Sequence, residues 1–98
     1  MGGGERVELE RDVEQHLMRS VESMGGMCIK HGQDGWPDRI VLLPDGRVTW
    51  VELKRTKGKL ADLQKYRAAQ LEKVGQEVVC LWSKDEVDKW IKEKGTES

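Results

Sequence analysis

The sequence predicts an α/β fold: a mixed four-stranded sheet flanked by helices, with an extra helix at its C-terminal end. In three segments, apolar residues recur every three or four positions, as they do in amphipathic helices. Four short runs rich in β-branched and apolar residues alternate with them, and a tight turn joins two of these runs. Because the 98 residues contain no repeat or low-complexity linker, we expect a single domain over 1–98, with 1–4 disordered and 95–98 as a tail.

The first half of the chain predicts one helix and three strands. Valines, leucine and methionine at helical spacing indicate a helix over 5–24, which Gly25 and Gly26 end. A short strand follows over 27–30, then a glycine-containing loop over 31–37. The runs 39–43 and 48–53 enclose the turn signal Pro44-Asp45-Gly46-Arg47, so we expect them to pair as an antiparallel hairpin.

The second half predicts a helix, a strand and a last helix. Leu60, Leu63, Leu71 and Val74 mark the helix, which Gly75 closes. The run 78–82 is almost wholly apolar, which predicts a central strand covered on both faces. Ser83 and Glu86 have the spacing of a capping box, and the helix that follows turns Val87, Trp90 and Ile91 inward. The predicted order is therefore α-β-β-β-α-β-α.

The net charge of −1 argues mildly against a nucleic-acid partner, but the charges are segregated along the chain. The segment 54–67 contains one acid, Asp62, against six bases: Lys54, Arg55, Lys57, Lys59, Lys65 and Arg67. Since a polyanion meets the local potential rather than the total charge, this segment is a candidate phosphate-binding surface. A solvated helix face rich in lysine explains the same pattern.

Two cysteines, Cys28 and Cys80, are too few for the disulfide framework of a small secreted domain. With no signal peptide, myristoylation signal or apolar run of about 18 residues, we expect an intracellular protein with buried, reduced thiols. Cys28 and His31 have a metal-like spacing, but no second pair completes a zinc site.

Polar residues lie where the helical patterns call for apolar ones. Glu10 falls at the centre of the apolar stripe of the first helix and Glu14 near its edge, while Gln64 lies within the stripe of the second. Taken alone, each is explained equally well as a residue at the edge of the core.

The hairpin gives a sharper signal. Glu52 and Lys54 lie two residues apart on one strand, so their side chains share a face, and Asp38 lies opposite Glu52 at the open end. A surface ion pair is the ordinary explanation, but two nearby carboxylates repel unless a proton or cation lies between them. Mg²⁺ accepts such ligands, and a cation there would polarise a phosphate and acidify a water.

These residues also carry a family resemblance. Pro37-Asp38 followed by Glu52-Leu53-Lys54 resembles the PD-(D/E)XK nuclease signature, and the element order is similar to its restriction-endonuclease-like α-β-β-β-α-β core. More narrowly, the chain resembles stand-alone, phage-type VRR-NUC domains over about residues 8–82. The stretches that match are Glu10, Gly25-Gly26, 35–39, 51–54 and Leu63-Gln64.

The resemblance implies a Mg²⁺- or Mn²⁺-dependent DNA endonuclease. Asp38, Glu52 and the Leu53 backbone carbonyl would hold the metal, with Glu10 acting directly or through water. Lys54 would be the catalytic lysine and Gln64 would orient the site. Whether Glu10 or Glu14 faces the site stays open. Contacts to DNA would come from the basic run, namely Arg55, Lys57, Lys59, Lys65 and Arg67.

Small stand-alone members of the family are homodimers that act on branched DNA, especially four-way (Holliday) junctions, and a phage-encoded member would work in the cytoplasm of a bacterial host. Trp90 and Ile91, or the first helix, are candidate interfaces. Trp36 departs from the small or aliphatic residue that many relatives have before Pro-Asp, and it either stacks on a base or plugs the sheet edge. Three rival functions remain: a non-catalytic DNA-binding module, an adaptor without a nucleic-acid role, and a nuclease for flaps, linear DNA or RNA.

Overall fold

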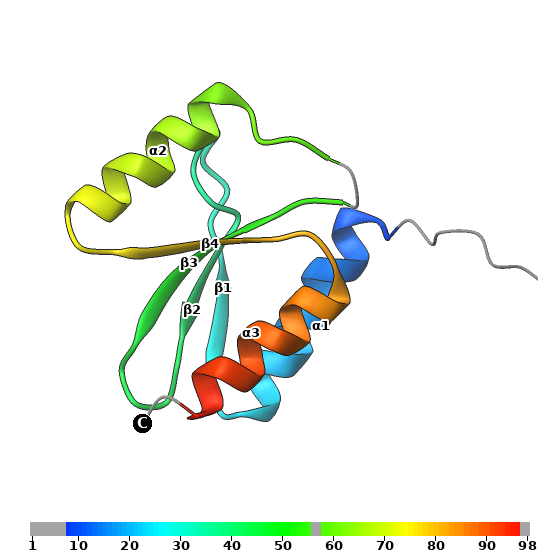
Figure 1. Cartoon of the computed structure of the whole chain (residues 1–98). Coiled ribbons are helices and arrows are strands. Elements are labelled where there is room, and N and C mark those ends of the chain that lie inside the picture. Colours follow the sequence, from blue (N-terminus) through cyan, green and yellow to red (C-terminus); the bar gives the residue numbers. More distant parts are fainter. Residues whose placement is uncertain (1–7, 56–57, 97–98) are drawn as a thin grey trace, which may run out of the picture.

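The computed structural model describes residues 8–55 and 58–96 and confirms the predicted class and element order (Figure 1). Along the chain the elements are α1 (Glu10–Ser23), β1 (Met27–Lys30), β2 (Arg39–Leu42), β3 (Val48–Leu53), α2 (Asp62–Lys73), β4 (Glu77–Leu81) and α3 (Lys84–Thr96). The strands form one sheet in the order β1-β2-β3-β4, with the first three antiparallel and β4 parallel to β3. The predicted β2–β3 hairpin is therefore present.

The helices are divided between the two faces of the sheet. In Figure 1, α1 and α3 lie side by side against one face, and α2 lies on the other. Because β3 and β4 are parallel, the chain must return to the starting end of the sheet between them, and α2 makes that crossover. The site end of the sheet, where β3 ends, is thus flanked by the start of α1 and the start of α2.

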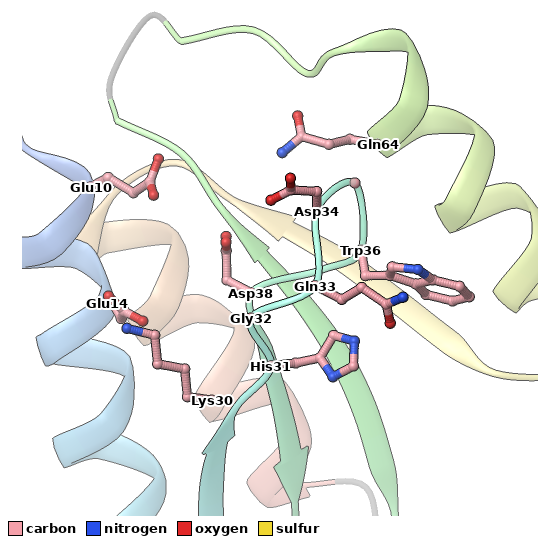
Figure 2. A pocket seen from close by; sticks show the side chains of 11 residues that line it. Glu10, Glu14, Lys30, His31, Gly32, Gln33, Asp34, Trp36, Asp38 and Gln64 are labelled. Atoms are coloured by element: carbon pink, nitrogen blue, oxygen red, sulfur yellow. The ribbon is translucent and has the colours of Figure 1, made fainter.

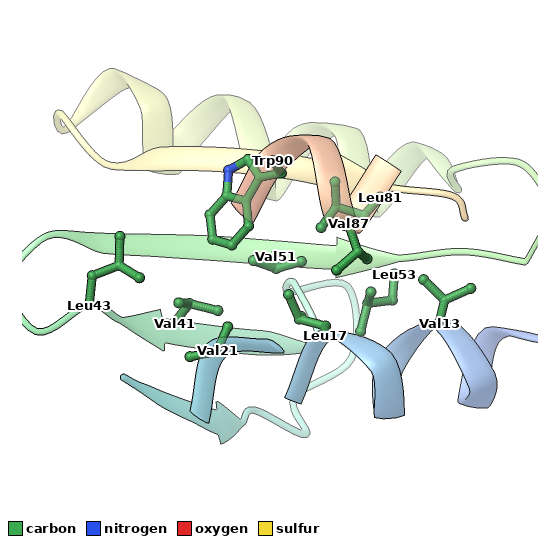
Figure 3. Packing of buried hydrophobic residues seen from close by; sticks show 10 residues of the cluster. All are labelled: Val13, Leu17, Val21, Val41, Leu43, Val51, Leu53, Leu81, Val87 and Trp90. Carbon is green, nitrogen blue, oxygen red and sulfur yellow. The ribbon is translucent and has the colours of Figure 1, made fainter. Parts of the chain in front are cut away.

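The core fills the space between the sheet and the α1–α3 pair (Figure 3). Val13, Leu17 and Val21 from α1 are completely buried, as the helical spacing predicted. They meet residues of the strands and of α3 that are also buried, among them Val41, Val51, Leu53, Val87 and Trp90. This layer rigidly supports the strand ends that carry the site.

The first helix begins later than predicted. Leu9 is extended, with φ −76° and ψ 151°, and helical residues start at Glu10. The earlier part of the predicted helix, with Val7, lies outside the described residues, as do residues 1–4. Of the predicted tail at 95–98, the first two residues belong to α3, and 97–98 lie outside the described residues. Glu10 is consequently the first residue of its helix and is exposed at the end of the apolar stripe, instead of pointing into the sheet.

The prediction of a central fourth strand is wrong. β4 lies at the sheet edge and pairs with β3, and Val78, Val79 and Cys80 are half-buried. An apolar run indicates that both faces of a strand are covered, and here α2 covers one face of β4 and α3 the other. The run does not indicate how many strands pair with β4.

The apolar stripe predicted for the second helix is only partly buried. Leu60 precedes α2, and Leu63 and Val74 are 45% and 73% exposed, so Leu71 is the buried member. Because α2 contacts β4, the same sheet face stays open over the other strands, where Met27, Ile29 and Val48 are exposed.

The remaining local predictions hold in part. The Glu86 N–H donates to Ser83 Oγ at 3.1 Å, while the Glu86 carboxylate accepts from the Trp82 N–H, so only half of the capping box forms. Cys28 and Cys80 are free and half-buried, and burial raises their thiol pKa values to about 11 and about 12.

Within the described part of the chain, no helix has the length and apolar character that crossing a membrane needs.

Candidate active site

Asp38 and Glu52 meet at the open end of the hairpin. Arg39 pairs with Val51 in the β2–β3 register, so the residues one step further out are Asp38 and Glu52. The Leu53 N–H donates to Asp38 Oδ2 at 2.8 Å, which fixes the Asp38 carboxylate against the backbone of β3. The turn chemistry at residues 44–47 sets this register and therefore brings the two acids together.

Glu52 is a buried carboxylate, only 5% exposed. The pKa of Glu52 is raised from its ordinary value of 4.5 to about 8. Burial is the largest cause, followed by the negative charge of Asp38 and a hydrogen bond with the Asp38 carboxyl group. The metal-free pair therefore holds a proton at neutral pH. That is the behaviour of two carboxylates that lack a cation between them.

Lys54 lies beside this pair, on the same face as Glu52. Its Nζ is 3.9 Å from Glu52 Oε2, and its side chain is 18% exposed, so the ammonium lies at the mouth of the site. The Lys54 N–H donates to Leu81 O at 3.1 Å, which keeps this part of the chain attached to β4 beyond the last residue of β3. The ordinary surface ion pair is excluded, because both side chains are largely buried.

Gln64 reaches the site from the first turn of α2. Its Nε2 donates to Glu52 Oε2 at 2.8 Å, and its Oε1 accepts from the Ala61 N–H at 2.8 Å. The Gln64 side chain therefore binds the Glu52 carboxylate and also caps the N-terminus of its own helix. The apolar stripe that singled out this residue is mostly exposed, but the residue itself lies where the motif places it.

Glu10 approaches from the opposite side, on α1. It lines a hollow of about 280 Å³ together with Asp38 and Gln64 (Figure 2). Partial burial raises the pKa of Glu10, with Asp38 as the next contributor. Glu14 lines the same hollow but lies 2.7 Å, through Oε2, from Arg39 Nε. Of the two acids that the sequence left open, Glu14 is thus held by a cation of the chain itself.

Asp34 is a site-lining residue that the sequence reasoning missed. It lies in the β1–β2 loop, and Figure 2 shows Asp34 and Glu10 directing their carboxylates toward Asp38 from opposite sides. Loop residues follow no periodicity, so no pattern distinguished Asp34. Its proximity to Pro37-Asp38 was the one available signal.

Trp36 is half-buried and packs against other side chains of the protein, as the plug alternative expects, and it also lines the hollow. Its ring lies 6.2 Å from that of Trp50, and the Arg67 guanidinium lies 5.0 Å above it. At Gly35 (φ 81°), a Cβ would come within 2.4 Å of Leu63 Cδ2, so only glycine lets α2 approach the loop. These contacts hold the loop that leads into Asp38.

The predicted DNA-contacting residues differ in their surroundings. Arg55, Lys59 and Lys65 are exposed near the site end of the sheet. Arg67 is half-buried, stacked on Trp36 and 5.5 Å from the Tyr66 ring centroid. Lys57 lies outside the described residues.

The donor set suits a hard divalent cation better than zinc. In residues 8–55 and 58–96, no three His, Cys, Asp or Glu side chains are grouped as an ion cage, which also removes Cys28 and His31 as a zinc pair. Mg²⁺ needs only one or two carboxylates and keeps several waters. Glu52, which is buried, and Asp38, which is half-buried beside it, supply two such carboxylates.

Comparison with known proteins agrees with this geometry. No family model matches the chain. A protein of Acyrthosiphon pisum secondary endosymbiont phage 1 named "Putative nuclease p44" is 36% identical over 83 residues, which cover 82% of this chain and 89% of that protein. A solved structure described as "VRR_NUC domain" superposes with a TM-score of 0.77 and 31% identity, over 85% of this chain and 94% of the other. The chain belongs to the VRR-NUC family of nucleases.

Membership confirms the resemblance and the fold class inferred from Pro37-Asp38 and Glu52-Leu53-Lys54. This VRR-NUC domain is therefore a nuclease by family. A nuclease of this fold is expected to use a divalent metal in general, and the carboxylates described above are the residues available for it.

Proposed function

We propose that this VRR-NUC domain is a Mg²⁺- or Mn²⁺-dependent endodeoxyribonuclease that hydrolyses phosphodiester bonds in branched DNA, four-way (Holliday) junctions in particular. The observation that carries the proposal is the meeting of two carboxylates, Asp38 and Glu52, with Lys54 at one strand end. Asp38 also lines a polar hollow, and two carboxylates beside a lysine are groups that a metal-centred hydrolase can use.

Asp38, Glu52 and the Leu53 backbone carbonyl are the ligands in this proposal, and Glu10 acts directly or through water. When bound, the ion would polarise the phosphoryl oxygen and lower the pKa of a water molecule. Glu52 would hold the ion in its ionised form, and the Leu53 N–H keeps the other carboxylate, Asp38, in place. Gln64 holds Glu52 Oε2 through its amide, so the carboxylate has one orientation.

Lys54 supplies the positive charge next to the scissile phosphate. Its ammonium is anchored near Glu52 and partly exposed, so it stabilises negative charge that develops on the phosphate oxygens, or holds the attacking water. Both roles require the ammonium in the same position, at the mouth of the site.

DNA is the proposed substrate because exposed basic side chains follow Lys54 along the chain and lead away from the site. Arg55, Lys59 and Lys65, with Lys57 outside the described residues, would neutralise phosphates on either side of the cleaved bond. Arg67 would add charge from a fixed position, since Trp36 and Tyr66 restrain its guanidinium.

A homodimer is the proposed assembly, because two symmetric cuts need two active sites and a C2 pair supplies them. Of the candidate interfaces from the sequence, Trp90 and the α1 stripe are buried inside the chain itself, and Ile91 is half-buried against the same core. The open part of the sheet, with Met27, Ile29 and Val48 exposed, is the surface that a second copy would cover. Ile29→Glu should then convert the dimer to a monomer in size-exclusion chromatography with light scattering.

The proposed place of action is the inside of a cell, the cytoplasm of a bacterial host if the chain is phage-encoded. Two features support this: the similar protein belongs to a phage, and the free thiols of Cys28 and Cys80 have pKa values raised by burial, so they are protonated. Localisation of a tagged chain in host cells, by fractionation, tests it.

The function is tested with labelled linear duplex, flap, splayed-arm and four-way-junction DNA, each incubated with Mg²⁺, Mn²⁺ or EDTA. Symmetric incisions in the junction, only with metal, would support the full proposal. Preferential cleavage of the flap or the linear duplex would retain the metal-dependent nuclease but replace the substrate. DNA binding without any cleavage in either metal would favour the non-catalytic module instead.

A further inference from the structure

Two residues of the candidate site lie on different elements that are far apart along the chain. Glu10 lies on α1, and Asp38 immediately precedes β2, so the docking of α1 on the sheet sets the separation of their carboxylates. One helical turn after Glu10 lies Glu14, and directly after Asp38 lies Arg39. These two neighbours bond to each other, with Arg39 Nε 2.7 Å from Glu14 Oε2.

Arg39 is held from several directions. The residue is 8% exposed, and its position in β2 places its side chain on the same face as Val41, toward α1. Its NH1 also donates to Cys28 O in the adjacent strand at 3.3 Å. The guanidinium is therefore a fixed point on the sheet, and Glu14 attaches α1 to that point.

The other contacts between α1 and the sheet are less directional. Val13, Leu17 and Val21 bury apolar surface, and such packing tolerates small slides and rotations of a helix. His16 pairs with Asp88 at 2.7 Å, but this tie runs to α3 and is exposed. A charge-assisted bond to a planar guanidinium has a defined geometry, and breaking a buried pair is costly.

We propose that the Glu14–Arg39 ion pair positions the metal site by fixing the turn of α1 that carries Glu10 against the strand end that carries Asp38. The inference rests on the proposed metal-dependent function. Glu14 is proposed as a positioning residue and not a metal ligand, because its Oε2 is bound to Arg39. Arg39 likewise acts through Asp38 and Glu10 and does not touch the substrate.

The test is the affinity of the DNA-free protein for Mn²⁺, measured by titration calorimetry on the parent chain, Arg39→Met, Glu14→Gln and the double variant. We expect about tenfold weaker binding for either single variant, the usual effect of losing a residue that orients a ligand. The double variant should be no weaker than Arg39→Met, because the two changes remove one interaction. If Glu14 were instead a ligand, Arg39→Met would leave Mn²⁺ affinity unchanged or raise it, and that result would overturn the inference.

Lys94→Met is the control for loss of an ion pair elsewhere in the fold. Lys94 Nζ binds Glu77 at 2.7 Å, between α3 and β4, and the Lys94 side chain is 7% exposed. The Lys94→Met variant should have a lower unfolding midpoint than the parent chain, with a Mn²⁺ affinity within about twofold of the parental value. Arg39→Lys keeps the charge but loses the guanidinium geometry, so this conservative variant should stay folded and still bind Mn²⁺ more weakly.

The outcomes separate the two claims. A parent chain that binds Mn²⁺ alongside Arg39→Met and Arg39→Lys variants of parental affinity would refute the positioning role alone. A parent chain that binds no Mn²⁺ and cuts no DNA would refute the proposed function, and the positioning role with it.

Discussion

Gln64 bridges α2 and the buried acid of the site: its Nε2 donates to Glu52 Oε2 at 2.8 Å, and its Oε1 accepts from the Ala61 N–H at 2.8 Å. One amide group thus closes the first turn of a helix and orients a carboxylate on β3. Movement of α2 away from the sheet would break the bond to Glu52, whereas the bond to Ala61 lies within the start of α2 and would move with it. The position of Glu52 therefore depends on a helix that has few other buried contacts, since Leu71 is the buried residue of α2.

Gln64→Ala should lower the cleavage rate about 10- to 100-fold, because Glu52 loses the donor that orients it. DNA affinity in EDTA should stay at the parental value. Rates under single-turnover conditions, with DNA binding measured by fluorescence anisotropy, check both expectations. Gln15→Ala, at an exposed position on α1, is the control, and an equal loss of rate in both variants would contradict the orienting role.

Lys54→Ala should lower the cleavage rate by about 100-fold or more and leave most of the DNA affinity in place. The ammonium is the positive charge nearest to Glu52, and removing one such stabilising group from a site usually costs this much. The same rate assay applies, with Lys89→Ala on α3 as the comparison, because that lysine is exposed and lies outside the proposed DNA surface. Parental cleavage by Lys54→Ala would rule out the proposed mechanism.

The sequence predicted the site well where local chemistry decides the geometry. The turn at residues 44–47 fixes the hairpin register, and the register alone brings Asp38 to Glu52. Lys54 followed from strand alternation in the same way. Gln64 and Glu10 were found through the family motif, while the apolar patterns first used for them were only partly right.

Features that depend on docking were not predictable from one sequence. The Glu14–Arg39 pair joins residues far apart in the chain, and only the placement of α1 on the sheet shows which acid faces the site. The edge position of β4 depends on the crossover through α2, and an apolar run does not record it. The contact of Trp36 with Arg67 likewise joins a loop to a helix that follows it by about 30 residues, and no local pattern records it.

Glu52→Gln should change how stability depends on pH. Burial, with Asp38 as the next cause, raises the pKa of Glu52 from its ordinary 4.5 to about 8, so the folded metal-free chain binds a proton that the unfolded chain releases. This contribution is complete below about pH 4.5 and is lost as the pH rises through about 8. Urea midpoints in EDTA should therefore fall from pH 5.5 to 8.5 in the parent and fall less in Glu52→Gln. Equal slopes in both proteins would show that Glu52 does not hold the proton.

The Lys59→Ala, Lys65→Ala double variant should reduce the salt dependence of DNA binding. Both lysines are exposed, and each phosphate contact contributes about 0.9 to the slope of log affinity against log salt. Binding titrations between about 50 and 200 mM salt should show a slope smaller by about 2. Lys89→Ala with Lys92→Ala, exposed on α3, should leave it unchanged; equal slopes for both double variants would remove these residues from the DNA surface.

The most direct test of a metal-centred active site is single-turnover cleavage of a four-way junction as a function of Mg²⁺ concentration, by the parent chain and Asp38→Asn. Asp38 is fixed by the Leu53 N–H and adjoins Glu52, so its negative charge is required for metal binding in the proposed mechanism. The predicted result is saturable, EDTA-sensitive cleavage by the parent and none by Asp38→Asn, which still binds the junction. Cleavage that persists in EDTA, or Asp38→Asn cutting at the parental rate, would contradict it.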